Sequence, residues 1–390
     1  MKTLVTIRQA SFAKYIMVDI LYALRANGIE TDWIDLEQVV YNVRNASKEE
    51  KQSAVEEAMA KLTSPEYHFI TSYGIEYFCN TFETLSIGID APLYTIIKKP
   101  AVNFFFDFGK PFDPRPETDA EIALVQVMNK PDYLFYCWDQ IALKKMLNLE
   151  MNRSFYFPMA VNPDAFPDSK SFTERSANII FAGGPTPDRI THLKMVSDLG
   201  LSVFGYKEDE WHAGGLGDCW NEPVKKREVL AEVYGDSKIA INITRAHGES
   251  SLNMRVYEAM AAGCVMLTDD KGDARELFKE DEIVTYTTLE DLREKTQFLL
   301  NNPELAISIA QKGRQRVLAE HTYLNRIKDI MPQIIQWYRE HRLFEKAGQF
   351  ALNDQAKALQ FLEYAIGKVT TIELNVDILD KIRAGETLSS

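Results

Sequence analysis

One short segment combines a hydroxyl, a guanidinium and a carboxylate at helical spacing. Ser251, Arg255 and Glu258 fall within about 60° of one another when a helix turns by about 100° per residue. A carboxylate accepts hydrogen bonds from two neighbouring sugar hydroxyls, and a guanidinium forks onto phosphate oxygens. This stripe of three side chains therefore has the groups needed to bind the ribose and the phosphates of a nucleotide. An ordinary solvated face with an Arg255–Glu258 pair three residues apart gives the same pattern.

The helix expected to carry this stripe follows a buried strand and a polar loop. The strand covers residues 239–243, the loop 244–250 and the helix 251–262. Ser250 or the serine after it can cap the helix, and Gly248 lets the loop backbone approach a ligand. Anions bind at helix starts of this kind in open α/β sheets, so the loop predicts a diphosphate site.

Strands and helices alternate along the first half of the chain. This order is typical of a parallel sheet covered by helices on both faces. The apolar runs predict strands over 4–7, 29–36, 67–70, 101–106 and 132–137, with helices over 15–24 and 48–62.

The same alternation restarts after a proline-rich stretch at 157–167, which we interpret as an extended connection between domains. Beyond residue 289 the pattern is helical. In this half we expect strands over 178–182, 201–205, 239–243, 265–268 and 283–286, and helices over 188–199, 225–234, 251–262, 322–340 and 345–366.

The predicted fold class is α/β, with two Rossmann-like doubly wound domains and a helical C-terminal extension. We place an N-terminal domain at 1–160, a second at 170–320, and C-terminal helices at 321–390. The C-terminal helices either pack back on the N-terminal domain or offer a surface to a partner.

Composition excludes several classes of protein. The 390 residues include 44 Lys plus Arg against 57 Asp plus Glu, which gives 44 − 57 = −13, and no basic arm is present. We therefore expect no nucleic-acid partner. The four cysteines are far apart and are interpreted as reduced thiols. No run of 18 apolar residues occurs, so we expect a cytoplasmic protein with no transmembrane segment.

Several motifs resemble a known family. Asn242-Ile243-Thr244-Arg245, then Ser-Leu-Asn-Met-Arg-Val-Tyr-Glu-Ala-Met-Ala-Ala-Gly at 251–263, then Leu267-Thr268-Asp269, resemble the donor-binding core of GT-B glycosyltransferases, in particular the spore-maturation CgeB-like group. Segments 157–163, 181–184 with Asp188-Arg189, and 312–323 are similar to the same group.

The resemblance implies transfer of a sugar from a nucleotide-sugar donor, with a UDP-sugar expected and no metal or cofactor. It places Glu258 at the donor ribose, Tyr206 beside the nucleobase, and Arg189 toward the phosphates after two glycines. The donor-binding residues expected are Gly183, Gly184, Arg189, Tyr206, Arg245, Ser251, Asn253, Arg255 and Glu258.

One position departs from the family pattern. Related retaining transferases carry two glutamates eight positions apart, and the partner position of Glu258 is Ser250, with Glu249 one residue out of register. Whether the reaction inverts or retains configuration is therefore left open.

Two side chains are candidates for acid–base catalysis. His247 lies in the loop beside the expected diphosphate, and Asp107 ends an apolar strand of the N-terminal domain. A histidine bonded to backbone and a turn-capping aspartate are the alternatives. On the acceptor side we expect Arg8, Tyr73 and Glu76 from fold geometry.

Two other functions fit the same fold. One is a non-catalytic GT-B-like binding or scaffold protein, favoured by Ser250 in place of glutamate. The other is a nucleotide-sugar epimerase or a phosphorylase. The acceptor of a transferase, whether a protein, a surface glycan or a small molecule, is not encoded in these motifs.

Overall fold

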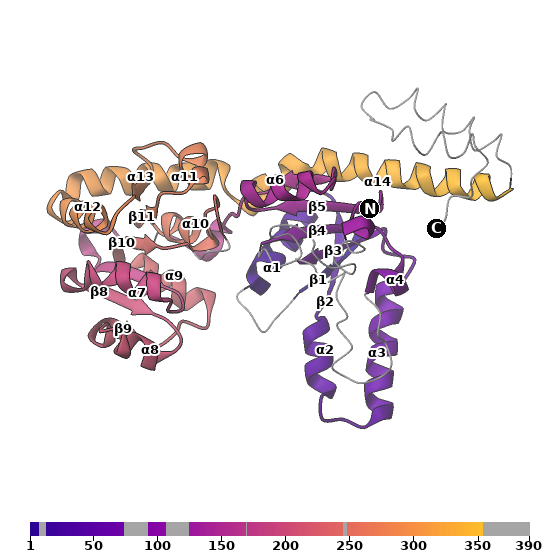
Figure 1. Ribbon diagram of the computed structural model, residues 1–390, viewed down its shortest axis with the longest axis horizontal. Helices are drawn as coiled ribbons and strands as arrows, with labels where there is room; N and C mark the ends of the chain where they lie inside the picture. The colour runs from indigo at the N-terminus through magenta and orange to yellow at the C-terminus, as the bar shows by residue number, and fades with distance from the viewer. Residues whose placement is uncertain (8–12, 74–92, 107–124, 169, 245–247, 354–390) are drawn as a thin grey trace. The chain divides into compact units, whose positions relative to one another are not determined.

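The computed structural model describes most of the chain. The described residues are 1–7, 13–73, 93–106, 125–168, 170–244 and 248–353. Two compact units are present, Met1–Asp329 and Ile330–Ser390, and α14 (Tyr323–Asn353) begins in the first and continues into the second. Both sheets belong to the first unit (Figure 1).

The first sheet is built from the N-terminal residues. Its strand order is β2-β1-β3-β4-β5-β6, and all of its neighbouring strands are parallel. The strands are β1 (Lys2–Thr6), β2 (Glu30–Ile34), β3 (Phe69–Tyr73), β4 (Ala101–Phe105), β5 (Tyr133–Cys137) and β6 (Ser154–Tyr156). The helices are α1 (Ala13–Ala26), α2 (Leu36–Val43), α3 (Lys48–Thr63), α4 (Leu93–Ile97) and α6 (Gln140–Asn148).

The second sheet has the order β12-β11-β10-β7-β8-β9 and is also parallel throughout. Its strands are β7 (Ala177–Ala182), β8 (Leu201–Phe204), β9 (Trp220–Asn221), β10 (Ser237–Asn242), β11 (Val265–Asp269) and β12 (Val284–Tyr286). The helices are α7 (Pro187–Lys194), α8 (Glu208–Ala213), α9 (Arg227–Gly235), α10 (Met254–Ala261), α11 (Gly272–Leu277), α12 (Leu289–Asn301) and α13 (Pro303–Glu320). Two parallel-sheet α/β domains confirm the predicted fold class.

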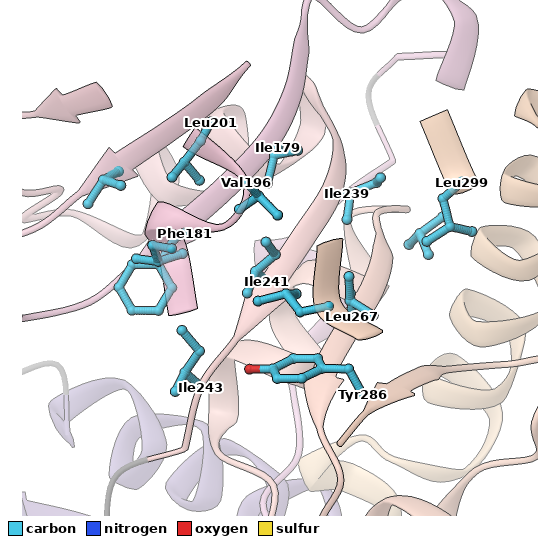
Figure 2. Close-up of a cluster of buried hydrophobic side chains, with 14 of the residues drawn as sticks. Ile179, Phe181, Val196, Leu201, Ile239, Ile241, Ile243, Leu267, Tyr286 and Leu299 are labelled. Carbon is cyan, nitrogen blue, oxygen red and sulfur yellow. The ribbon is translucent and has the colours of Figure 1, made fainter. Parts of the chain in front are cut away.

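The central strands of the second sheet are buried on both faces. Ile179 and Ile180 are successive residues of β7, point to opposite faces and are both fully buried. One face packs in a cluster with Leu193 of α7 and Leu299 of α12, which Figure 2 shows in part. This explains why these strands are continuous apolar runs in the sequence and were predictable from it.

The predicted ends of two helices are wrong. The helix expected at 251–262 begins only at Met254. The break expected between 340 and 345 is absent, because α14 continues to Asn353. The remainder of the predicted helix at 345–366 lies outside the described residues.

A buried ion pair joins the two sheet domains. Arg227 at the start of α9 donates from both terminal nitrogens to the carboxylate of Asp19 in α1, at 2.9 Å for Nη1. Asn162 also donates to Asp19, and the Arg227 guanidinium lies over the ring of Tyr15. Both charged side chains are more than nine-tenths buried, so each depends on the other for its stability in the folded state.

Replacing Arg227 with Ala should lower the free energy of unfolding by about 3 kcal/mol, because it leaves the Asp19 charge buried without its main partner. Urea denaturation measures this change. The double variant Asp19→Asn with Arg227→Met removes both charges and should recover most of the loss. A double variant less stable than the single one would contradict this account of the pair.

Candidate functional site

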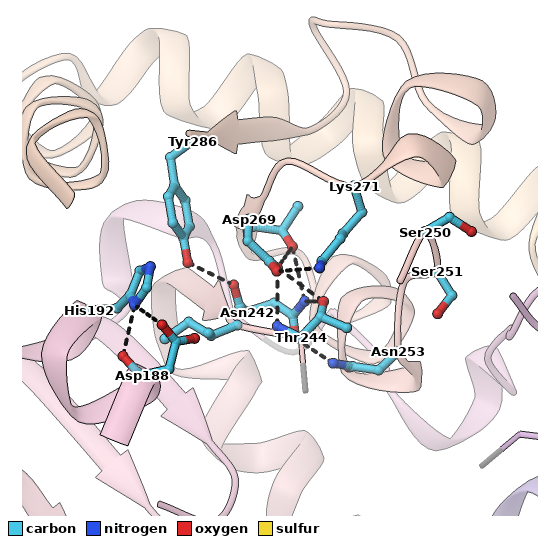
Figure 3. Close-up of polar contacts among 12 residues, drawn as sticks. Asp188, His192, Asn242, Thr244, Ser250, Ser251, Asn253, Asp269, Lys271 and Tyr286 are labelled. Carbon is cyan, nitrogen blue, oxygen red and sulfur yellow. Dashed lines mark hydrogen bonds and ion pairs between the residues drawn. The ribbon is translucent and has the colours of Figure 1, made fainter. Parts of the chain in front are cut away.

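Polar side chains gather where the strands of the second sheet end. Asn242, the last residue of β10, donates to Thr268 of β11 at 2.9 Å and to Thr244 at 3.3 Å. Its own side-chain oxygen accepts from Asn253 Nδ2 at 2.6 Å, and its backbone oxygen accepts from the Tyr286 hydroxyl at 3.4 Å. Figure 3 shows these groups converging. Asn242 therefore ties β10 to β11, β12 and the start of α10.

Asp269, the last residue of β11, continues this network. Its Oδ1 accepts from the backbone N–H and the hydroxyl of Thr244, at 3.1 and 3.0 Å, and from the Thr268 hydroxyl at 3.1 Å. Lys271 Nζ lies 3.6 Å from Oδ2. The aspartate thus fixes Thr244, the first residue of the loop predicted to contact diphosphate.

Arg189 enters the site from α7 but is directed at backbone carbonyls. Thr186 caps α7 by accepting the Arg189 N–H at 3.2 Å. The guanidinium donates twice to the Ile243 oxygen, at 3.1 and 2.8 Å, and once to the Gly184 oxygen at 3.0 Å. A Cβ at Gly183 would come within 3.2 Å of this guanidinium. Arg189 therefore links the end of β7 to the end of β10, and its contact with phosphate stays a prediction.

The start of α10 differs from the prediction. The cap is Asn253, whose Oδ1 accepts the Arg255 N–H at 3.0 Å. Ser250 and Ser251 precede the helix in an irregular segment, so the predicted serine cap is wrong. Ser251 is fully buried, and its hydroxyl oxygen has no hydrogen-bond partner among the described residues.

Glu258 lies one turn into α10 and is only 3% exposed. Its Oε2 has no hydrogen-bond partner among the described residues. Burial raises the pKa of its carboxyl to about 7, against the positive charges of Arg255 and Arg227, which lower it. A native protein rarely keeps such a group unsatisfied, because a buried acceptor without a partner costs free energy.

The structure brings five predicted donor-side residues into one domain edge and its adjoining helix: Arg189, Ser251, Asn253, Arg255 and Glu258. Tyr206 follows β8, is 54% exposed, and accepts the Trp211 indole N–H through its backbone oxygen. Tyr73 ends β3 in the other sheet and packs its ring on Phe106. The predicted residues Arg8, Glu76, Asp107, Arg245 and His247 lie outside the described residues.

Sequence reasoning missed three residues of this edge as site components. Asn242, Thr244 and Asp269 organise the strand ends, and all three stand in the segments that carried the family resemblance. The available signal was a polar residue directly after an apolar strand, which marks the carboxyl edge of a parallel sheet.

Among the residues that the structure describes, no three His, Cys, Asp or Glu side chains come together in a way that could hold a metal ion. None of the described helices combines the length and apolar character needed to cross a bilayer.

The match to a known protein family falls in the second domain. Residues 189–332 match the family described as "Glycosyl transferase-like". No curated protein sequence matches the chain. The matched segment contains β10, α10 and β11, and hence the network around Asn242.

Solved structures extend the likeness to both domains. Sucrose-phosphate synthase from Thermosynechococcus elongatus is 14% identical, with a TM-score of 0.58, over 87% of this chain and 98% of that one. Anabaena Alr3699/HepE in complex with UDP-glucose is 11% identical, with a TM-score of 0.60, over 86% and 100%. A trehalose-6-phosphate synthase is 13% identical, with a TM-score of 0.55, over 86% and 99%.

The fold is that of GT-B glycosyltransferases. The GT-B likeness covers both sheets, because each comparison spans more than four-fifths of the chain. The polar strand ends around Asn242 and Asp269 belong to the second, C-terminal domain of this fold.

The raised pKa of Glu258 predicts a stability cost at neutral and alkaline pH. A carboxyl that holds its proton more tightly in the folded state contributes stability below pH 4.5, and this is lost as the pH rises through about 7. Glu258→Gln removes the titration. The variant should therefore match the wild type near pH 5 and exceed its free energy of unfolding at pH 8 by on the order of 2 kcal/mol.

Glu282 provides the matched control for this measurement. It is also buried, but Arg316 Nε donates to it at 2.9 Å, and its pKa is lowered despite burial. Glu282→Gln should therefore lose stability at pH 8, the opposite sign. Urea denaturation at the two pH values measures both variants. Equal shifts in both would refute the assignment of Glu258 as an unsatisfied carboxyl.

Proposed function

We propose that this protein is a glycosyltransferase that moves a sugar from a nucleoside-diphosphate sugar to an acceptor. The C-terminal domain holds the donor at the carboxyl edge of its sheet. The single observation that carries the proposal is Glu258, a buried carboxylate with one oxygen left without a partner. Two adjacent ribose hydroxyls supply the donors that such a carboxylate lacks.

The surroundings of Glu258 support a diphosphate beside the ribose. Arg255 stands one turn earlier on α10, and its positive charge acts on the Glu258 carboxyl. The Ser251 hydroxyl is buried without a partner just before the helix. Positive charge and a helix start together stabilise the departing nucleoside diphosphate as the sugar bond breaks. In this proposal Arg255 and the α10 start carry most of the catalytic effect.

The finer parts of the proposal rest on the sequence resemblance. They comprise membership of the CgeB-like group, a hexosyl donor carried by UDP, independence from metals and cofactors, and a cytoplasmic location. Asp107 and His247 are proposed for proton transfer, and Arg8, Tyr73 and Glu76 for the acceptor side. The GT-B likeness to a protein in complex with UDP-glucose supports the choice of UDP.

A second candidate function is nucleotide-sugar binding without transfer. It is favoured by Ser250, which stands where retaining relatives carry a glutamate. All three of its polar groups are engaged within the protein: its N–H with Asp139, its hydroxyl with Gln140 and its oxygen with Asp273. Binding of a UDP-sugar with neither transfer nor hydrolysis across a set of acceptors would favour this candidate.

The ribose contact is tested by comparing UDP with 2′-deoxy-UDP in calorimetry. The wild type should bind UDP at least about tenfold more tightly, since one good hydrogen bond to a charged acceptor contributes on the order of 1.5 kcal/mol or more. Glu258→Ala should bind UDP at least about tenfold more weakly than the wild type and lose the preference for the 2′-hydroxyl. Arg255→Ala should weaken UDP binding but keep that preference.

Glu232→Ala is the matched control, because Glu232 is an exposed glutamate on α9 of the same domain. It should bind both nucleotides like the wild type. A thermal-shift screen with GDP, dTDP and CDP tests the choice of base. If Glu258→Ala bound UDP as tightly as the wild type, the donor site would lie elsewhere.

A further inference from the structure

Asp139 connects the N-terminal domain to the segment that precedes α10. It follows β5 and caps α6, where its Oδ1 accepts the Ala142 N–H at 2.9 Å. Its Oδ2 accepts the backbone N–H groups of Ser250 and Ser251, at 2.9 and 3.1 Å. The residues of this contact are 111 and 112 positions apart in the chain.

The contact is reciprocal and almost completely buried. The Ser250 hydroxyl accepts the Gln140 N–H at 3.1 Å, and the Ser250 backbone oxygen accepts the Asp273 N–H at 3.0 Å. Asp139 is fully buried and Ser250 is 7% exposed. Each polar group of Ser250 is therefore fixed by a partner, and two of the three partners belong to the β5–α6 junction of the other domain.

A neighbouring carboxylate strengthens the same junction. Asp273, at the start of α11, accepts from the Tyr156 hydroxyl and from Gln140 Nε2, the latter at 3.4 Å. A Cβ at Gly248 would come within 3.2 Å of the Trp138 ring and 2.7 Å of Thr244. The segment before α10 is thus held against the N-terminal domain at Gly248 as well as at Ser250.

Burial raises the pKa of Asp139, but the N–H groups of Ala142, Ser250 and Ser251 outweigh burial and hold it below its ordinary value. The carboxylate is therefore ionised at neutral pH. It has two accepting oxygens, and each serves a different element. An asparagine offers only one accepting oxygen and turns an N–H₂ group toward the other set of N–H donors.

We propose that Asp139 is a positioning residue for the donor site: it holds the segment before α10 in the conformation that binds the nucleotide diphosphate. This inference rests on the proposed function. Asp139 does not touch the donor in this arrangement, because both of its oxygens are occupied by backbone N–H groups. Donor affinity consequently depends on a residue of the opposite domain, at the point where the acceptor side meets the donor side.

The test compares Asp139→Asn with Asp35→Asn. Asp35 caps α2 in the same domain by accepting the Gln38 N–H at 2.8 Å, so both variants weaken a helix cap by the same chemical change. Asp139→Asn should raise the Kd for UDP at least fivefold in calorimetry, whereas Asp35→Asn should stay within twofold of the wild type. An Asp139→Asn variant within twofold of the wild type would overturn the proposal.

Amide hydrogen exchange gives a readout that does not depend on the nucleotide. The Ser250 and Ser251 amides should exchange at least tenfold faster in Asp139→Asn than in the wild type, and remain unchanged in Asp35→Asn. Unchanged protection would also overturn the proposal. If the wild type bound no nucleotide while these amides lost protection, the proposed function would fail and the fixing of the segment would stand.

Asp139→Ser keeps the test open if Asp139→Asn does not fold. A serine still caps α6, but its single short hydroxyl does not also reach the N–H groups of Ser250 and Ser251, which Asp139 holds through its second oxygen. This variant should raise the Kd for UDP at least fivefold and speed exchange at the Ser250 and Ser251 amides. Wild-type values for both quantities in a folded Asp139→Ser variant would overturn the proposal.

Discussion

All strands of a parallel sheet end at the same edge, and the backbone groups they leave there must find partners. In the C-terminal domain these partners are side chains rather than further strands. Asn242 binds β11, β12 and α10 together, and Asp269 fixes Thr244. Arg189 satisfies the Ile243 oxygen from α7. Because these particular groups are paired within the protein, their positions at the edge do not depend on a ligand, which is what a preorganised binding site requires.

Two buried carboxylates near this edge, Asp139 and Glu258, are in opposite electrostatic states. Asp139 accepts three backbone N–H groups, and its pKa is held low. Glu258 keeps an oxygen without a partner, and its pKa is raised to about 7. A buried carboxylate whose two oxygens both accept hydrogen bonds within the protein stabilises the fold. A buried carboxylate that lacks a hydrogen-bond partner lowers stability, and it is retained where a ligand supplies the missing donor.

The sequence predicted the parts of the molecule that are encoded locally. Strands such as β7 and β10 are buried on both faces and so leave continuous apolar runs that periodicity can detect. The start of α10 was misplaced because Ser250, Ser251 and Asn253 are all good capping residues, and only the fold decides among them. The Arg189 guanidinium donates to the carbonyl of Gly184, five positions away, and to that of Ile243, 54 positions away, and the second contact has no local signature in the sequence. The contact of Asp139 with Ser250 spans 111 positions and has no local signature.

This contact also gives a physical reason for the serine at position 250. Its hydroxyl is short enough to accept the Gln140 N–H while its backbone N–H reaches Asp139. A glutamate there would remove that acceptor and add a negative charge beside Asp139 and Asp273, both already buried. Like charges in a buried site disfavour ionisation and destabilise the folded state. The serine at position 250 therefore avoids a third carboxylate beside two that are already buried, and it leaves the N–H groups of the segment before α10 paired with Asp139 of the opposite domain.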